Sequence, residues 1–215
     1  MISTRDLTVL PSIPRLNRIT KSLALLDAII TPEWDHRYYS FNSKWSAGQE
    51  MASMRNGQGD AWFCVFSDVG VFLKGFDHES QMSPWSTKPT NVWRGVLDEV
   101  PDKFDPFATE PAFSMADTTF CIWRGHDDDR WRTGHIEWPS GEDPDGSEWM
   151  LLILDGDPQK YKSWAETCYK RSVSPELINH VYEHHPLTDE FVLRLNPERD
   201  LKTLASDVEE IGYPA

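Results

Sequence analysis

The chain lacks both a long hydrophobic run and any short motif that identifies a reaction. A membrane-spanning helix needs about 18–20 consecutive apolar residues, so we expect no membrane span and no membrane partner. The sequence contains no Gly-x-Ser-x-Gly elbow, no His-Glu-x-x-His pair, no Gly-Lys-Ser/Thr phosphate loop and no Cys-x-x-Cys pair. Since these motifs mark hydrolases, metalloproteases, nucleotide-binding enzymes and redox proteins, their absence favours a protein that is not an enzyme and has no cofactor.

Cysteine is scarce: the three cysteines are Cys64, Cys121 and Cys168. An odd number at wide spacing does not predict a disulfide framework. The basic N-terminal region and the apolar run that follows it resemble an export signal, but Asp27 interrupts the run and no small-residue cleavage site follows. We therefore expect a reduced, cytoplasmic location.

Positive charge is also scarce, and it is unevenly distributed. Residues 1–100 carry 10 Lys and Arg against 11 Asp and Glu, whereas residues 101–215 carry 11 against 24. The resulting net charge of −14 falls almost wholly in the second half of the chain. Such a field repels the phosphate backbone, so we expect no nucleic-acid binding, and it attracts basic proteins.

The pattern of apolar residues predicts an α+β fold in a single domain, 1–215. Ile19, Leu23, Leu26 and Ile30 share one face of an N-terminal helix over 17–30. The expected strands occupy a sheet region, 36–154, and cover 36–41, 61–66, 71–76, 118–123, 130–138 and 149–154, with a short helix at 49–55. Short connections favour an antiparallel meander, and a group of C-terminal helices over 158–211 is expected to pack against the sheet.

The first candidate site is the loop Asp77-His78-Glu79-Ser80, directly after an expected strand. His78 has the chemistry of a general base or metal ligand, the carboxylates can orient it, and Ser80 can act as a nucleophile. Asp60 comes near this loop if the preceding strands are antiparallel. A turn whose side chains bond backbone groups is the preferred interpretation of this loop, so His78, Glu79 and Ser80 are catalytic candidates only.

The second candidate site is the acidic run Asp127-Asp128-Asp129, which follows His126. Carboxylates bind hard cations, but adjacent residues seldom point into one site, and two nearby arginines can neutralise them. A solvated hairpin tip of high negative potential is the preferred interpretation. No His and Cys spacing matches a zinc site and the acidic turn at 143–148 fails the calcium-loop pattern, so we assign no metal.

Eight of the ten tryptophans fall into two groups. Trp62, Trp123, Trp149 and Trp164 lie in apolar stretches, where we expect core positions. The loops and polar-flanked segments hold the second group, Trp85, Trp93, Trp131 and Trp138. Exposed tryptophan beside carboxylates is typical of protein-binding surfaces.

Three functions remain open. The preferred one is a non-catalytic, acidic binding module for a basic protein, as in toxin-neutralising immunity proteins, where charge steers the encounter. Its expected binding residues are Asp77, His78, Glu79, Trp85, Trp93, Asp127, Asp128, Asp129 and Trp131. The alternatives are a small hydrolase, with or without a metal, that uses the 77–80 loop, and an aromatic-lined pocket for a sugar or other small ligand. The sequence indicates no oligomeric state.

Overall fold

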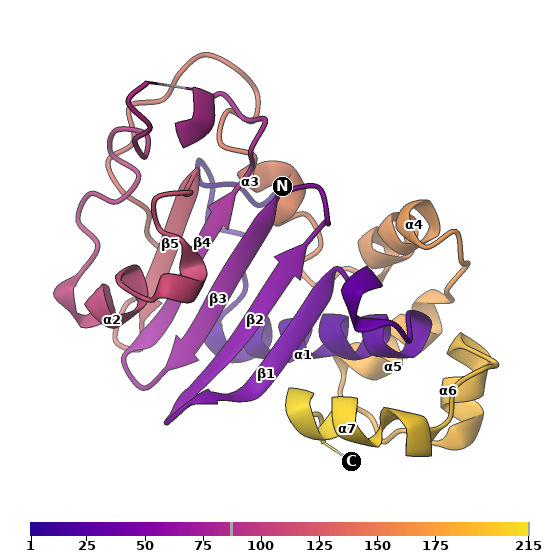
Figure 1. Cartoon of the computed structure of the whole chain (residues 1–215). Coiled ribbons are helices and arrows are strands. Elements are labelled where there is room, and N and C mark those ends of the chain that lie inside the picture. Colours follow the sequence, from indigo (N-terminus) through magenta and orange to yellow (C-terminus); the bar gives the residue numbers. More distant parts are fainter. Residues whose placement is uncertain (87, 215) are drawn as a thin grey trace.

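The computed structural model describes residues 1–86 and 88–214, and a five-stranded sheet lies at its centre (Figure 1). Each strand is antiparallel to the next, in the order β1-β2-β3-β4-β5. The strands are β1 (Tyr39–Ser46), β2 (Gln49–Arg55), β3 (Ala61–Ser67), β4 (Gly70–Phe76) and β5 (Phe120–Gly125). The structure therefore confirms the α+β class and the antiparallel meander.

Helices precede and follow the sheet in the chain. They are α1 (Ile13–Ile30), α2 (Asp105–Ala108), α3 (Ser147–Met150), α4 (Pro158–Cys168), α5 (Pro175–Tyr182), α6 (Asp189–Leu195) and α7 (Leu201–Ile211). Short 3-10 helices lie at Trp34–His36, Pro84–Ser86, Asp102–Phe104 and Pro111–Phe113. The N-terminal helix and the C-terminal group are thus present as predicted, although α1 begins four residues before position 17.

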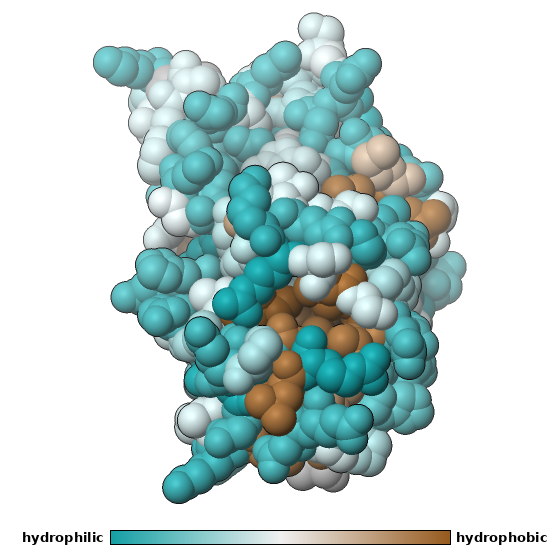
Figure 2. All heavy atoms as spheres, turned by 90° about the vertical axis from the view of Figure 1, so that its right-hand side faces the viewer, coloured by the Kyte–Doolittle hydropathy of each residue, from teal (hydrophilic) through white to brown (hydrophobic). Residues whose placement is uncertain are grey.

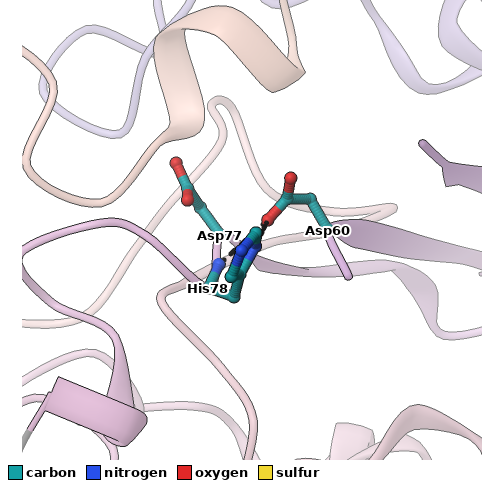
Figure 3. A group of neighbouring side chains, drawn as sticks. All are labelled: Asp60, Asp77 and His78. Atoms are coloured by element: carbon teal, nitrogen blue, oxygen red, sulfur yellow. Dashed lines mark hydrogen bonds and ion pairs between the residues drawn. The ribbon is translucent and has the colours of Figure 1, made fainter. Parts of the chain in front are cut away.

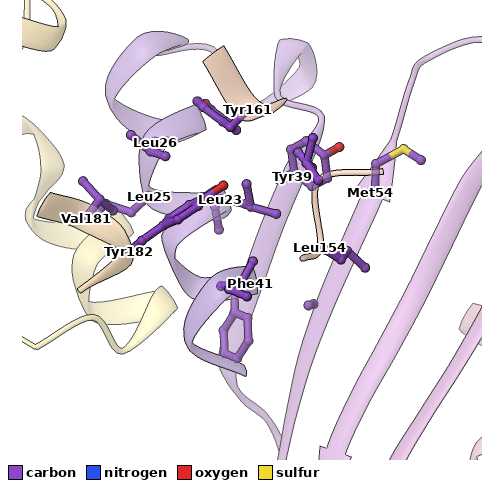
Figure 4. Packing of buried hydrophobic residues seen from close by; sticks show 14 of the residues in the cluster. Leu23, Leu25, Leu26, Tyr39, Phe41, Met54, Leu154, Tyr161, Val181 and Tyr182 are labelled. Atoms are coloured by element: carbon purple, nitrogen blue, oxygen red, sulfur yellow. The ribbon is translucent and has the colours of Figure 1, made fainter. Parts of the chain in front are cut away.

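One face of the sheet packs against α1, which lies between the strands and the C-terminal helices (Figure 4). Leu23 and Leu26 of α1 are fully buried, as are Tyr161 of α4 and Tyr182 of α5. The side chains of α1 meet both neighbours because apolar residues cover most of its circumference. This shared core supports a single domain over 1–215, which remains a prediction.

The other face of the sheet is covered by the irregular segment between β4 and β5. Five proline residues keep regular structure in this segment short. Its aromatic residues Phe104, Phe107 and Phe113 nevertheless pack with Phe72 and Trp123 of the strands in a second apolar cluster. The molecule therefore has three layers, namely helices, sheet and an irregular cover.

Residues 49–55 form strand β2, so the predicted helix at this position is wrong. The segment pairs with β1 on one side and β3 on the other. Its side chains alternate between faces: Ala52 and Met54 enter the helical-side core, while Met51 packs on the opposite cluster. Pairing on both edges satisfies the backbone of this segment, and this tertiary gain overrides local propensity.

Three other strand predictions are also corrected. Residues 36–38 precede β1, which begins at Tyr39. Residues 130–138 contain only an isolated bridge between Arg132 and Trp123. Residues 149–154 belong to α3 and the turns after it. Their apolar side chains are largely buried beside α1 and the C-terminal helices, which an apolar run alone does not distinguish from a buried strand.

The C-terminal helices begin at capped positions that the sequence predicts. Asp157 and Ser174 each accept a backbone N–H of the first turn and are each followed by proline. Figure 2 shows the face that these helices form with the sheet edge: it is mostly hydrophilic, with apolar side chains gathered in a hollow near its centre.

A buried carboxylate ties α1 to the sheet and to α4. Asp27 is fully buried, and its Oδ2 accepts hydrogen bonds from the backbone N–H groups of Tyr38 (2.9 Å) and Tyr39 (2.8 Å) and from the hydroxyl of Tyr169 (2.6 Å). The hydroxyl of Tyr161 donates to Oδ1 at 3.3 Å. Burial raises the pKa of Asp27 to about 7, against the opposing effect of these hydrogen bonds.

Candidate functional site

The candidate site lies at the end of the sheet where β3 begins and β4 ends. Ala61 pairs with Phe76, and Gly75 pairs with Phe120 at the start of β5. The antiparallel register therefore brings the turn before β3, the loop after β4 and the residues before β5 to one edge. Asp60 and the 77–80 loop meet there, as the sequence suggested for antiparallel strands.

Asp60 and His78 are joined by two polar contacts at the site (Figure 3). Asp60 Oδ1 accepts the backbone N–H of His78 at 2.9 Å and lies 2.7 Å from His78 Nδ1. Asp60 Oδ2 accepts the side-chain amide of Asn56. The hydrogen bond to Asp60 is the main cause that raises the pKa of His78 above its ordinary value. His78 is thereby held in one orientation and favoured in its protonated form.

Asp77 points away from this pair (Figure 3) and supports an indole. Its Oδ1 accepts the backbone N–H of Glu79 at 3.0 Å, and its Oδ2 accepts Nε1–H of Trp149 at 2.9 Å. A second carboxylate has the same role on the other side of the loop, where Asp117 Oδ1 accepts Nε1–H of Trp85 at 2.7 Å. Each indole is therefore fixed by an acid.

Both indoles are exposed although their N–H groups are bonded. Trp85 is 57% exposed and Trp149 is 45% exposed. The ring of Trp85 lies edge-on to Phe76, with centroids 4.9 Å apart, and 6.3 Å from the His78 ring. Large aromatic faces held at the surface by packing and hydrogen bonds have little conformational entropy to lose when a partner covers them.

The loop 139–149 lies beside the 77–86 loop and carries Trp149. The N–H of Met82 donates to the carbonyl of Pro144 at 3.1 Å. Asp143 accepts the N–H groups of residues 148 and 149, which starts α3. Asp145 is buried and accepts hydrogen bonds from Thr4 and Ser147, so the N-terminal segment anchors this loop. Burial raises the pKa of Asp145.

The surface around the two indoles is strongly acidic. Its carboxylates lie in the 77–79 segment, before β5 and in the 142–148 loop. Within the part of the chain that the structure describes, six of these carboxylates form no ion pair with Lys or Arg, namely Asp77, Glu79, Asp117, Glu142, Asp143 and Glu148. The nearby cations are Lys74, which interacts electrostatically with Asp117, and Arg5, which donates to the carbonyls of Gly141 and Glu142. The carboxylates outnumber these cations, so the potential at this end of the sheet favours a cationic partner.

The geometry does not assemble a nucleophile with a base. Ser80 Oγ is buried and has no hydrogen-bond partner among the described residues, whereas a serine nucleophile must contact its base. The ring nitrogens of His78 face Asp60 and, at 3.9 Å, Glu79. Ser80 therefore lacks the contact with a base that a serine nucleophile requires.

Asp60, Asp77 and His78 are the residues that could hold a metal ion, because one ligand atom of each lies within 4.8 Å of the others. Their oxygens, however, already accept hydrogen bonds from Asn56, Glu79, Trp149 and His78 itself. Each of these hydrogen bonds uses one lone pair of a carboxylate oxygen and helps to hold the three side chains together. The contacts explain the cluster without a metal.

The 126–129 run lies at the opposite end of the sheet. Gly125 pairs with Gly70, the first residue of β4, while the 77–80 loop follows the last one. A strand of this length spans about 20 Å, so the two acidic segments do not form one site. Asp128 accepts the N–H of Gly125 at 2.7 Å, Asp129 lies 3.8 Å from Arg132, and Asp127 is exposed.

The remaining tryptophans have separate environments. Trp62 and Trp123 are buried core residues as expected, and Trp164 packs half-buried at the core edge. Trp131 is 5% exposed and donates to the carbonyl of Pro11, so it offers no large exposed face. Trp93, half-buried, donates to the carbonyl of Glu137. The expected core position of Trp149 is wrong, because α3 turns its ring outward to Asp77.

The sequence interpretation also missed Asp117 and Lys74. Nothing local marks Asp117, since its role depends on the position of Trp85. Lys74 did leave a signal, because it is a single charge inside the apolar run of β4. It is 2% exposed, and its ammonium donates to the carbonyl of Asp117. Lys74 thus helps to position Asp117, the residue that accepts the indole N–H of Trp85.

Replacing Lys74 by methionine is expected to raise the free energy of unfolding by about 2 kcal/mol at pH 7, because a buried charge is exchanged for an apolar chain of similar length. Burial lowers the pKa of Lys74 to about 8. The unfolded chain therefore holds a proton between pH 8 and about 10.4 that the folded one has lost, and wild-type stability should rise over this interval. Urea denaturation at pH 7 and about pH 9.5 measures both effects; a less stable Lys74→Met variant would contradict this account.

Because Gly146 has no side chain, the carboxylate of Asp77 can lie directly beside its backbone. The φ of Gly146 is +76°, and a Cβ there would lie 2.2 Å from Asp77 Oδ2. Gly146→Ala should therefore displace Asp77, release the Trp149 N–H and shift that indole signal in a proton–nitrogen NMR spectrum. Gly57→Ala is the matched control, since Gly57 has φ +72° with no atom within 4 Å. If both variants leave the Trp149 signal unchanged, Asp77 does not hold that ring.

Comparisons of the chain with protein-family models, curated proteins and solved structures give no match. Among residues 1–86 and 88–214, the structure has no helix with the length and apolar character required to cross a membrane.

Proposed function

We propose that this protein is a non-catalytic binding module for a basic protein partner and that the partner docks on the surface around Trp85 and Trp149. The observation that supports this function is the pair of exposed indoles, each with its N–H held by a carboxylate. Tryptophan is among the residue types most enriched at binding hot spots. Rigid aromatic faces supply the affinity, and the surrounding acids select a cationic partner.

The charge of the whole chain supports the same partner class. A net charge of −14 accelerates the encounter with a cationic protein. Toxin-neutralising immunity proteins act in this way, and blocking a basic enzyme is the biological role that we propose. We also propose a cytoplasmic location, supported by three free cysteines, of which Cys64 and Cys121 are buried. Thiol titration of the protein, isolated from its natural source and then unfolded, tests this location. Fewer than three free thiols would contradict it.

The proposal is tested by capture of the partner with the tagged protein at about 0.05 M and about 0.5 M salt, where screening differs strongly. The variant Glu79→Gln/Glu142→Gln removes two exposed charges of this surface and leaves the acceptors of both indoles in place. We expect it to retain less partner at low salt than the wild type does, because the steering charges are lost.

The control Asp68→Asn/Asp127→Asn removes the same charge from exposed positions at the other end of the sheet. It should capture as much partner as the wild type. Equal loss in both variants would show that only total charge matters, and capture that ignores salt and both variants would contradict an acidic docking surface.

A further inference from the structure

A cavity of about 500 Å³ lies at the end of the sheet away from Trp85 and Trp149. The residues before α2 form one wall, and the segment after β5 forms the other. Its lining includes Lys103, Trp123, Asp128, Arg130, Trp131 and Arg132. This size falls within the range of small-molecule sites.

The lining reverses the charge of its surroundings. Residues 101–215 carry 11 Lys and Arg against 24 Asp and Glu, yet the cavity presents Lys103, Arg130 and Arg132 against two acids, Glu99 and Asp128. Glu99 lies 3.4 Å from the His135 ring, and Asp128 is engaged with the N–H of Gly125. The two acids can offset two of the three cations, since Asp128 also lies 3.9 Å from Arg132, and one positive charge remains in excess.

Within the described ranges, two of the three cations have no carboxylate partner. Arg130 has no hydrogen bond, ion pair or ring contact among these residues. The ammonium of Lys103 lies over the ring of Phe104, 5.4 Å from its centroid, and forms no ion pair within the described ranges. Its ammonium occupies the space beside Gly125, where a Cβ would lie 2.2 Å from Nζ. Arg132 is held loosely, 3.9 Å from Asp128 and 3.8 Å from Asp129.

Two tryptophans also line the cavity. Trp123 is 1% exposed and lines the cavity, and its indole N–H has no hydrogen-bond partner within the described part of the chain. The other lining indole, Trp131, already donates to the carbonyl of Pro11 at 2.7 Å. Neither indole N–H is open to a ligand, because protein atoms enclose that of Trp123 and Pro11 binds that of Trp131. The two rings therefore line the cavity, and its cations supply the binding groups.

We propose that this cavity binds a small organic oxyanion, a carboxylate or phosphate group that pairs with Arg130 and Lys103 in the space that Trp123 and Trp131 line. Oxyanions suit the guanidinium of Arg130, which donates two parallel hydrogen bonds. The cavity and the surface around Trp85 and Trp149 lie at opposite ends of β4 and β5, so this site is independent of the proposed protein-binding function.

The test uses citrate and inorganic phosphate as probes, each titrated to about 10 mM, which saturates a site with a Kd of about 1 mM. The indole signal of Trp123, assigned with Trp123→Phe, should move as an anion enters the cavity that its ring lines. A response to citrate alone identifies a carboxylate ligand, and a response to phosphate alone identifies a phosphate ligand. No response to either probe overturns the proposal.

Variants locate the site. Arg130→Ala should weaken probe binding about tenfold, because it removes a charge-assisted hydrogen bond. Arg94→Ala is the matched control: Arg94 is also exposed, with 81% of its side chain accessible, but pairs with Glu137 outside the cavity. It should bind the probes as the wild type does. Equal weakening by both variants would mean a general charge effect and would overturn the site, while partner capture through Trp85 and Trp149 would be unaffected.

Discussion

The Asp27→Ala variant is expected to lose about 4 kcal/mol of unfolding free energy, the largest stability effect of any single change considered. The substitution leaves the N–H groups of Tyr38 and Tyr39 buried without their acceptor and also removes the acceptor of the Tyr169 hydroxyl. Each unsatisfied buried group costs about 1–3 kcal/mol. Urea denaturation at about pH 6 measures the loss.

The control for this variant is Asp35→Ala, which removes an exposed carboxylate from the segment between α1 and β1. Its stability should lie within about 0.5 kcal/mol of the wild type, as for most surface changes. If Asp27→Ala were equally mild, the four hydrogen bonds to Asp27 would contribute little to joining α1, β1 and α4.

Asp27→Asn separates the charge of this residue from its hydrogen bonds. The amide oxygen can still accept the two backbone N–H groups, and the amide N–H can donate to Tyr161. Because the pKa of Asp27 is about 7 in the fold and about 3.9 in the unfolded chain, the folded state holds an extra proton between these values. Wild-type stability should therefore fall as pH rises from about 4 to about 7, by up to about 4 kcal/mol.

The carboxamide introduced by this substitution does not titrate, so the difference between the variant and the wild type isolates the effect of Asp27. Relative to the wild type, Asp27→Asn should become progressively more stable between about pH 4 and about pH 7 and show a constant difference above it. A difference independent of pH would show that Asp27 titrates in the fold as it does in the unfolded chain.

The Trp85→Ala/Trp149→Ala variant should weaken binding of the basic partner about 1,000-fold, since truncation of a hot-spot tryptophan costs about 2 kcal/mol or more. Both rings lie at the surface, so the fold should be retained. Calorimetric titration with the captured partner measures the Kd, and circular dichroism checks the fold.

Two further variants sharpen this result. Leu193→Ala truncates a side chain on α6 that is also exposed, at 46%. This control variant should bind the partner as the wild type does. Trp85→Phe keeps an aromatic face but loses the bond to Asp117, so its affinity should fall between wild type and Trp85→Ala. Unchanged affinity in the double variant would place the binding surface elsewhere.

The candidate site was only partly predictable. His78 and its neighbours follow directly after an apolar strand, and this position indicated a loop presented by a rigid scaffold. The contact with Asp60 required only that β3 and β4 pair antiparallel, which the short connection between them favours. The contact between Asp77 and Trp149 joins residues 72 positions apart, and no local pattern encodes it.

The same division applies to Trp149 and to residues 49–55. Their immediate neighbours in the sequence predict a core position for Trp149 and a helix for residues 49–55. Trp149 is turned outward because α3 begins beside Asp77, and 49–55 is a strand because β1 and β3 lie on either side. In each case a distant segment decided the outcome.

The sequence by itself determined the α+β class, the N-terminal helix, the hairpin of β3 and β4 and the starts of α4 and α5. These depend on periodicity, turns and capping residues, which act within a few positions of the chain. Only the tertiary structure decided which carboxylates hold the exposed indoles, that Asp27 is buried among its hydrogen-bond donors and where the basic cavity lies. Those features arise where separate segments meet, since hydrogen bonds and burial depend on distance in space and not on separation along the chain.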